Sequence, residues 1–523
     1  MRTEVSFLLI ALGQLCAVVM AQEQPAAVIS PSGTERPIYL THVTVIDTET
    51  GKESQDRTVV ISGDRISEVR DSKGVKPPPD AKVVDGTGKY LIPGLWDMHL
   101  HSWNYEATFP IYIANGVTGV RDMFGPQDAN KFRAELATKK RVTPHFYLAS
   151  PIIDGHPKMW PTSIEVSTPE QARKVVDEQH ERGADFIKVY SRLSRESYFA
   201  IIDESKHLNI PVEGHVPNQI GAWEASEAKQ KSFEHLHGIP DACSDREEEM
   251  QPKIIAAPSF KERLRLHAEA SRSHSEKKCQ RLFVQFVKNN TWQVPTLTLN
   301  RAFGMLNDPQ FTHDDRVRYF GGELRDLLTA KNDFRFTTWT AADFAAQREL
   351  YAYDQKVVGA MFRAGVPMLA GTDTGNPYCF PGFSLHDELA LLVESGVSPL
   401  GALQAATRNA ALFMDASDKY GSVSPGKVAD LVLLKADPLQ DVHNTTKISA
   451  VFLAGKEFDR AALDSMLRGA ETAAKEESER SSTEAELRAV MAELHRAALE
   501  GDTEKTTSLM TDEYVQTDIS GHF

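Results

Sequence analysis

The chain has 523 residues, of which 41% are hydrophobic and 25% charged, and its formal net charge is -15. This length accommodates several domains, and the composition is that of an ordinary globular protein with a sizeable core. The acidic balance argues against nucleic-acid binding, which needs a basic face to neutralise phosphates, and we interpret it as an aid to solubility.

The N-terminus has the layout of a secretory signal peptide. Arg2 precedes an apolar run from Val5 to Met20, and Ala21 offers a small residue for cleavage. The alternative is a membrane anchor, but the run is shorter than the about 20 apolar residues that a span requires. We therefore expect cleavage of residues 1–21, a secreted or periplasmic protein, and no stable membrane insertion.

The cysteines predict little cross-linking. Cys16 lies in the predicted signal, which leaves Cys243, Cys279 and Cys379. An odd number cannot all pair within one chain, so we expect at most one disulfide, and the sequence does not say which.

Strand-like sequence flanks a longer central region. After a polar leader over residues 22–37, residues 38–94 contain runs rich in Val, Ile and Thr that are broken by Gly turns, and similar runs return over residues 421–459. The second set could be an unrelated β-tail. We interpret both sets as one small composite β-sandwich domain.

The central region, residues 95–420, alternates short apolar runs with amphipathic helical stretches. Repeated strand–helix units predict a parallel sheet, and eight of them close a barrel. The expected fold class is therefore α/β, a TIM-like (β/α)₈ barrel beside the small β-domain. The long, charged, helical stretch near residues 242–345 is expected to add helices above the barrel mouth.

The last part of the chain, residues 460–523, begins as an Ala-, Glu- and Arg-rich stretch that predicts a helical linker. The end of the chain resembles the opening of a SnoaL-like α+β domain. Such a domain is longer than the sequence that remains, so we expect an incomplete segment with poor packing.

The sharpest motif is PGLWDMHLH, which places His99 and His101 two residues apart. Alternate residues of a β-strand point to the same side, so both imidazoles would project into the barrel at the end of its first strand. Barrel active sites lie at that end, and paired imidazoles suit zinc or a similar divalent metal.

Further candidate ligands end later strand-like runs, in the order that a barrel site requires. They are Lys188, His215, His235 and Asp373. Each would arrive at the same rim as the histidine pair, so we predict one shared metal centre.

Lys188 has two interpretations. If it loses its proton and adds CO₂, the resulting carbamate can bridge two ions about 3.5–4 Å apart. The alternative is a salt bridge in the barrel, which would leave a mononuclear site with Glu213 as a proton carrier.

Asp373 is the candidate catalytic residue. Its carboxylate can bind a metal and also accept a proton from metal-bound water, whose pKa is near neutral. The hydroxide would attack a carbonyl, and Asp373 would pass the proton to the leaving nitrogen.

With these motifs, the chain resembles the amidohydrolase superfamily over about residues 38–456. PGLWDMHLH, FIKVY, EGHVP, FEHLH and AGTDTG match its metal motifs, and the sequence after AGTDTG is similar to its imidazolonepropionase-like and prolidase-like branch. The resemblance implies a first metal on His99, His101 and Asp373 and a second on His215 and His235. It implies two zinc ions bridged by carboxylated Lys188. The EGHVP run departs from the HAHG-like run of that branch.

Candidate substrate contacts follow from position along the strands. Tyr190 and His237 lie two residues after Lys188 and His235 and should share the lumen face. His156 and Tyr378 fall near predicted strand ends or mouth loops, whereas His267 lies in polar helical sequence and is expected to be solvated.

The leading hypothesis is a metal-dependent hydrolase that cleaves C–N amide bonds of small substrates, such as dipeptides or cyclic amides. A mononuclear deaminase, a lactonase or esterase of the same fold, and a non-catalytic binding protein are the alternatives. The expected partner is a small molecule, and a homo-oligomer is left open.

Overall fold

The computed structural model describes residues 36–500, apart from 103, 140–141 and 332, together with residue 505. The predicted signal peptide lies outside the described residues, as does the end of the SnoaL-like segment. Within the described part, no helix is both long enough and apolar enough to cross a membrane.

A ring of parallel strands forms the centre of the molecule. β6 pairs with β7 and β7 with β8 in parallel, and a second parallel series runs from β11 through β12 and β13 to β14. The bounds are Leu95–Leu100 (β6), Val117–Asp122 (β7), His145–Leu148 (β8), Ile187–Val189 (β11), Val212–Gly214 (β12), Ser232–Glu234 (β13) and Trp292–Val294 (β14).

Hydrogen bonds outside these strands close the ring. Ala149 bridges in parallel to Phe186 and so joins β8 to β11. Residues 367–370 take the last place: Met368 bridges to Gln293 of β14, and Ala370 accepts from the backbone N–H of Met98 in β6. All the connections are parallel, as the predicted barrel requires.

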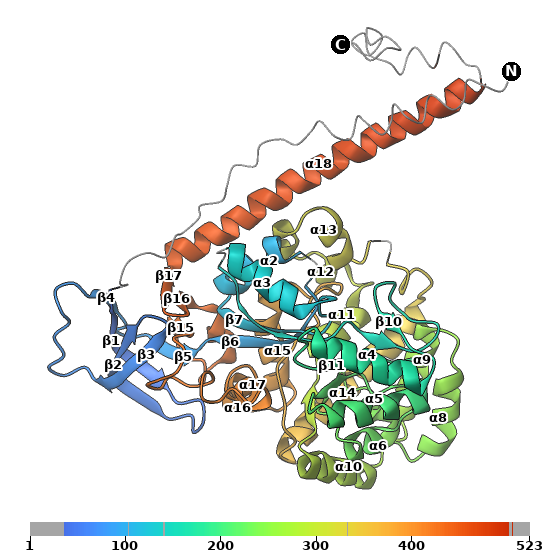
Figure 1. The fold of residues 1–523 in the computed structure, drawn as a ribbon, viewed down its shortest axis with the longest axis horizontal. Helices are drawn as coiled ribbons and strands as arrows, with labels where there is room; N and C mark the ends of the chain where they lie inside the picture. The colour runs from blue at the N-terminus through green and yellow to red at the C-terminus, as the bar shows by residue number, and fades with distance from the viewer. Residues whose placement is uncertain (1–35, 103, 140–141, 332, 501–504, 506–523) are drawn as a thin grey trace.

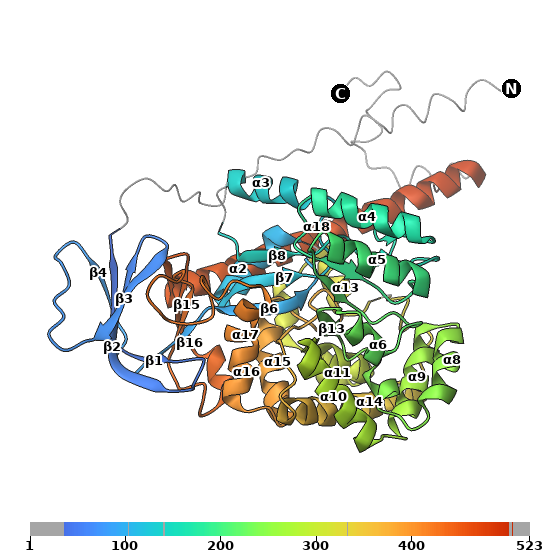
Figure 2. The ribbon, with the colours of Figure 1, turned by 60° about the horizontal axis from the view of Figure 1, so that its bottom comes forward.

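Helices follow the strands and pack outside the ring (Figures 1 and 2). Local sequence starts them: Thr168 caps α4 by accepting from the backbone N–H of Gln171, and Pro169 occupies the first helical position. The principal outer helices are Tyr105–Ala114 (α2), Ala129–Lys139 (α3), Pro169–Glu181 (α4), Arg195–His207 (α5), Ala222–Glu227 (α6), Glu276–Asn289 (α10), Ala341–Arg363 (α14), Phe383–Glu394 (α15), Pro399–Ala405 (α16) and Arg408–Phe413 (α17).

Two insertions follow β13 and β14 and match the predicted helical stretch. They contain Ile239–Ala242 (α7), Glu247–Ala256 (α8), Phe260–Ser271 (α9), Leu297–Met305 (α11), Pro309–Thr312 (α12), Asp315–Tyr319 (η2) and Gly322–Leu328 (α13). A disulfide joins Cys243 to Cys279, between α7 and α10, and Cys379 is free and buried. The expectation of at most one disulfide is met among the described cysteines.

Both segments that flank the barrel contribute to one eight-stranded sheet beside it, in the order β17-β16-β15-β5-β1-β2-β3, with β4 against β1. The sheet curls, because Arg65 of β3 bridges back to Val428 ahead of β15. Its strands are Ile38–Ile46 (β1), Glu53–Ser62 (β2), Arg65–Asp71 (β3), Lys82–Asp85 (β4), Tyr90–Pro93 (β5), Leu431–Leu434 (β15), Ile448–Leu453 (β16) and Lys456–Asp459 (β17). The residue boundaries that we assigned to the domains stay predictions.

The chain continues into one helix of 41 residues, Arg460–Glu500 (α18). Its first part packs on α2, η2 and α13, and the rest projects beyond the barrel (Figure 1). The predicted helical linker is therefore a single helix that begins directly after β17.

Candidate metal centre

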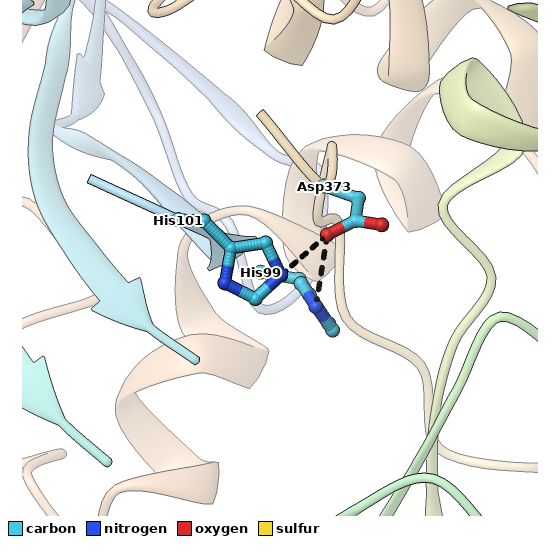
Figure 3. A group of neighbouring side chains, drawn as sticks. All are labelled: His99, His101 and Asp373. Atoms are coloured by element: carbon cyan, nitrogen blue, oxygen red, sulfur yellow. Dashed lines mark ion pairs between the residues drawn. The ribbon is translucent and has the colours of Figure 1, made fainter. Parts of the chain in front are cut away.

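His99, His101 and Asp373 form a group whose ligand atoms all lie within 4.8 Å of one another (Figure 3). Oδ1 of Asp373 is 3.2 Å from Nε2 of His99 and 2.9 Å from Nε2 of His101. The two histidines come from the end of β6, and Asp373 follows the last segment of the ring. The structure thus brings together residues that are more than 270 positions apart, as the predicted rim requires.

The backbone explains why the group forms at this place. The N–H groups of Thr372 and Asp373 both donate to the carbonyl of His99. Asp373 has φ 55°, a left-handed conformation that turns its carboxylate toward the histidines. Gly371 is required beside it, because a Cβ there would lie 2.6 Å from Cβ of His99.

Asp97 links by hydrogen bonds the two segments that carry the candidate ligands, the end of β6 and the segment around Thr372. Its carboxylate accepts from the hydroxyl of Thr372 at 2.7 Å and from the backbone N–H groups of Thr372 and His99. Burial raises the pKa of Asp97 to about 7, against the effect of these hydrogen bonds.

Further histidines surround the group. The ring centroid of His235 is 4.5 Å from that of His99 and 4.9 Å from that of His215. His235 Nε2 also lies 3.8 Å from Oδ2 of Asp373. The predicted second pair of ligands is therefore adjacent to the first.

In three of the four candidate histidines, Nδ1 already has a partner. His99 Nδ1 is 2.6 Å from Oε2 of Glu234. His215 and His235 use Nδ1 toward the hydroxyls of Ser191 and Thr296, at 2.8 Å and 2.7 Å. Nε2 of each ring is then left for a ligand bond, which is how metal-binding histidines are oriented.

Lys188 is fully buried in β11, and its Nζ has neither a hydrogen-bond partner nor an ion pair among the described residues. Burial lowers the pKa of Lys188 to about 8, although Glu234 and Asp373 act in the opposite direction. The alternative of a direct barrel salt bridge is thus not seen. Glu213, the proton carrier of that alternative, is instead paired with Arg121 at 2.7 Å.

The residues fit a divalent metal. Nε2 of His99, Nζ of Lys188 and Oδ1 of Asp373 are buried atoms without a hydrogen bond inside the described part of the chain. Buried polar groups are normally satisfied, so such a cluster fits a ligand that the protein atoms do not supply. Imidazole nitrogens with a carboxylate oxygen are the donors that zinc and similar ions take.

Comparison with known proteins agrees with this geometry. Residues 328–458, which include Asp373, match the model of the amidohydrolase family. No curated protein matches the chain.

Solved structures share the fold with this chain. A bottromycin amidohydrolase is 24% identical with a TM-score of 0.67, and the match covers 83% of this chain and 90% of that one. A Xaa-Pro dipeptidase with bound methionine is 17% identical with a TM-score of 0.58, covering 81% and 100%. A prolidase in complex with N-methylphosphonate-L-proline is 20% identical with a TM-score of 0.59, covering 81% and 100%.

The candidate metal centre opens into a cavity of about 840 Å³, which the helices of both insertions line together with the barrel rim. Tyr190 and His237 line it, as predicted. The ring of Tyr190 stacks on His215 with centroids 4.0 Å apart, and that of His237 is 4.2 Å from the same ring. A cavity of this size accommodates a small organic substrate.

Three histidine and tyrosine assignments need correction. His156 is outside the cavity, because its largely exposed ring pairs with Glu165 on the short strand Ile164–Glu165 (β10) at the surface. Tyr378 is also outside, because its hydroxyl donates to Thr312 and its ring packs in the core of the second insertion. His267, expected in solvent, lines the cavity and pairs with Asp241.

A charged network below the candidate ligands was not predicted. The fully buried guanidinium of Arg121 donates to Glu213, Ser232 and Glu234 and to the carbonyl of Met98. Burial alone would raise the pKa of Glu234, but Arg121 and His99 hold it below its usual range. Glu234 therefore stays an anion that can orient His99. Its only sequence signal is a carboxylate within a buried, strand-like run.

Proposed function

We propose that this protein is a metal-dependent hydrolase that cleaves C–N amide bonds of small substrates. The observation that carries the proposal is the convergence of His99, His101 and Asp373, with unpartnered buried atoms, at one end of a substrate-sized cavity. The match of residues 328–458 to the amidohydrolase family supports it.

We further propose that the centre is binuclear. His99, His101 and Asp373 would hold one ion, His215 and His235 the other, and Lys188 would bridge them as a carbamate. The isolation of the Lys188 amine and the adjacency of the histidine rings support this arrangement. Zinc is the proposed metal, because the donors are imidazole nitrogens and carboxylate oxygens.

When bound, the ions supply Lewis-acid activation of water and of the substrate carbonyl. The chain supplies the remaining steps. Asp373 accepts a proton from the attacking water and delivers it to the leaving nitrogen. Tyr190 and His237 line the cavity beside His215, where they can orient the substrate carbonyl. Glu234 keeps His99 in the orientation that presents Nε2.

The substrates that we propose are dipeptides, N-acyl amino acids or cyclic amides. Structures of the same fold that are described as a Xaa-Pro dipeptidase and a prolidase support small amides as the substrate class. From the N-terminal apolar run alone, we also propose that the enzyme acts in a secreted or periplasmic location.

The test combines metal analysis with one substitution. The purified protein is analysed for bound metals and assayed on dipeptides, N-acyl amino acids, cyclic amides and lactones, before and after chelation. Asp373→Asn is expected to keep the fold by circular dichroism and to lower kcat by about 10²–10⁴-fold, the contribution of a positioned acid–base group. Asp177→Asn, at an exposed position of α4, is the matched control.

Two results would contradict the proposal. One is parental turnover of an amide by Asp373→Asn. The other is full activity of protein from which all metal has been removed. Turnover of lactones without any amide would move the assignment to an esterase of the same fold.

A further inference from the structure

A group of cations lines the same cavity as the candidate metal centre. Arg192 follows β11, and Lys261 and Arg263 lie in the first turn of α9. We call these three residues the cationic wall. Arg192 comes from the barrel rim, whereas Lys261 and Arg263 come from an insertion. The three residues are close to one another because they line the same cavity.

The cationic wall has no carboxylate partners. No carboxylate oxygen of the described residues lies within 4.0 Å of the Arg192 or Arg263 guanidinium or the Lys261 amine. Arg192 donates to the carbonyl of Pro157 at 2.6 Å, and Lys261 donates to that of Thr338 at 3.0 Å. Nε of Arg263 is buried and has no hydrogen-bond partner in the described part of the chain.

A neighbouring arginine in the cavity shows the contrast. Arg335 also lines the cavity, but it forms an ion pair with Asp333 at 2.6 Å. It also donates to Oδ1 of Asn376 at 2.7 Å. Its charge is thus neutralised within the protein, and that of the cationic wall is not.

Like charges at this wall repel each other. Burial lowers the pKa of Arg263, and the positive charge of Arg192 lowers it further. Asp154 offsets part of this effect, but its carboxylate already accepts from the backbone N–H groups of Gly155, Met159 and Arg192. A partly buried guanidinium with an unpaired Nε is unfavourable, and an anionic ligand relieves that penalty.

The wall lies on the Tyr190 side of the metal centre. The groups whose charges act on the pKa of the Arg263 guanidinium are Arg192, Asp154 and Tyr190. Tyr190 in turn stacks on His215, one of the candidate ligands. A substrate whose scissile amide is held at the metal centre can therefore reach the cationic wall with another part of the same small molecule.

We propose that the cationic wall is the subsite for a free carboxylate of the substrate. This inference rests on the proposed amide hydrolysis and narrows its substrates to amides that also carry a carboxylate, such as dipeptides and N-acyl amino acids. Neutral cyclic amides are then poor substrates. Leu299, Phe303 and Phe334 add apolar surface to the cavity, which favours a hydrophobic side chain next to the carboxylate.

The test compares N-acetyl-L-phenylalanine with its C-terminal amide, which have the same scissile acetyl bond and differ by one charge. The parent enzyme is expected to prefer the acid by about 10–100-fold in kcat/KM, the range for hydrogen bonds to a charged group. Arg192→Met combined with Arg263→Met is expected to bring the two substrates within about threefold of each other, by loss of that interaction. Arg263→Lys, which keeps the charge, should retain part of the preference.

Arg272→Met is the matched control. Arg272 is the C-cap residue of α9, and it pairs with Glu349 outside the cavity. The substitution therefore removes one arginine from the end of the same helix and leaves the cationic wall unchanged. The control should show the parental ratio of acid to amide, and circular dichroism checks that each variant is folded.

Calorimetric binding of the acid and of the amide to the same preparations separates this inference from the proposed function. Hydrolysis of both compounds with equal kcat/KM and equal affinity would overturn the carboxylate subsite and leave amide hydrolysis intact. Binding of the acid that is lost only in the double variant supports the carboxylate subsite, even if neither compound is hydrolysed. The absence of hydrolysis would in that case count against the proposed reaction. Failure of the parent to bind the acid more tightly than the amide overturns the inference.

Discussion

Nδ1 of His99 donates a 2.6 Å hydrogen bond to Oε2 of Glu234, a residue 135 positions further along the chain. Both side chains are completely buried. Because Arg121 keeps Glu234 ionised, the acceptor is an anion, and the neutral imidazole must present Nε2 toward Asp373. The orientation of a candidate metal ligand is therefore set by a residue that is not itself a proposed ligand.

Glu234→Gln tests this relationship. The amide keeps the volume of the side chain but removes the negative charge, so we expect the affinity for the metal to fall by about 10–100-fold, the usual effect of losing such a partner. Titration against a competing chelator measures it. Glu178→Gln, on the surface of α4, is the control, and an affinity equal to the parental value in Glu234→Gln would refute the assigned role.

Lys188→Met tests the binuclear proposal. Methionine fills the buried space but cannot form a carbamate, so we expect the metal content to drop from two ions to at most one per chain. Elemental analysis of the purified variant gives the count. Lys174→Met, at an exposed helical position, should leave it unchanged, and retention of two tightly held ions by Lys188→Met would rule out the bridge.

His386 predicts a pH dependence of stability away from the metal centre. Its ring is buried between the Thr445 hydroxyl at 2.9 Å and the Asn115 carbonyl at 3.0 Å, and burial lowers its pKa from 6.5 to about 4. The unfolded chain then binds more protons than the folded chain between these values. His386 thus contributes stability that is complete above pH 6.5 and is lost as the pH falls to about 4.

The expected loss at His386 is about 3 kcal/mol over this window, from its change in pKa. We expect the melting temperature of the parent to fall more steeply than that of His386→Gln between pH 7 and pH 4.5. Comparing the slopes removes the contribution of the other titrating groups, which the two proteins share. Parallel curves would show that His386 does not contribute in this way.

The disulfide between Cys243 and Cys279 should stabilise the first insertion. The cysteines are 36 residues apart, for which the loss of chain entropy in the unfolded state corresponds to about 4 kcal/mol. Denaturation with urea, with and without reductant, measures the effect. Reductant should destabilise the parent but not a Cys243→Ala, Cys279→Ala double variant, and an equal response of both proteins would contradict the prediction.

The positions of the candidate ligands could be predicted because each lies at the end of a strand of a parallel ring. His99 and His101 follow the alternation of β6, and Lys188 and His215 end apolar runs at the same rim. Parallel strands place their carboxyl ends together, so the order along the sequence was sufficient to predict a shared centre.

Alternation fails at the end of β13, and this explains why Glu234 was missed. Strict alternation would point Glu234 and His235 to opposite faces. His235 has φ 58°, and this left-handed turn allows consecutive residues to face the same site: Glu234 contacts His99, and His235 lies beside Asp373. No residue of the FEHLH run predicts that turn.

The formation of the cationic wall and the exclusion of Tyr378 from the cavity both depend on tertiary packing. Arg263 reaches the cavity because α9 folds back over the barrel mouth, and Tyr378 is drawn away by its hydrogen bond to Thr312. Both outcomes depend on how the insertions pack against each other, and the period of a single helix or strand carries no information about that.

The pairing of β5 with β15 has a consequence for how the molecule is made. β5 leads through Gly94 directly into β6, yet its neighbour β15 lies more than 330 residues later in the sequence. During synthesis, one edge of β5 therefore stays open until the entire barrel has left the ribosome. An open edge invites pairing with other chains, so a nascent chain stalled within the barrel should aggregate far more readily than the finished protein.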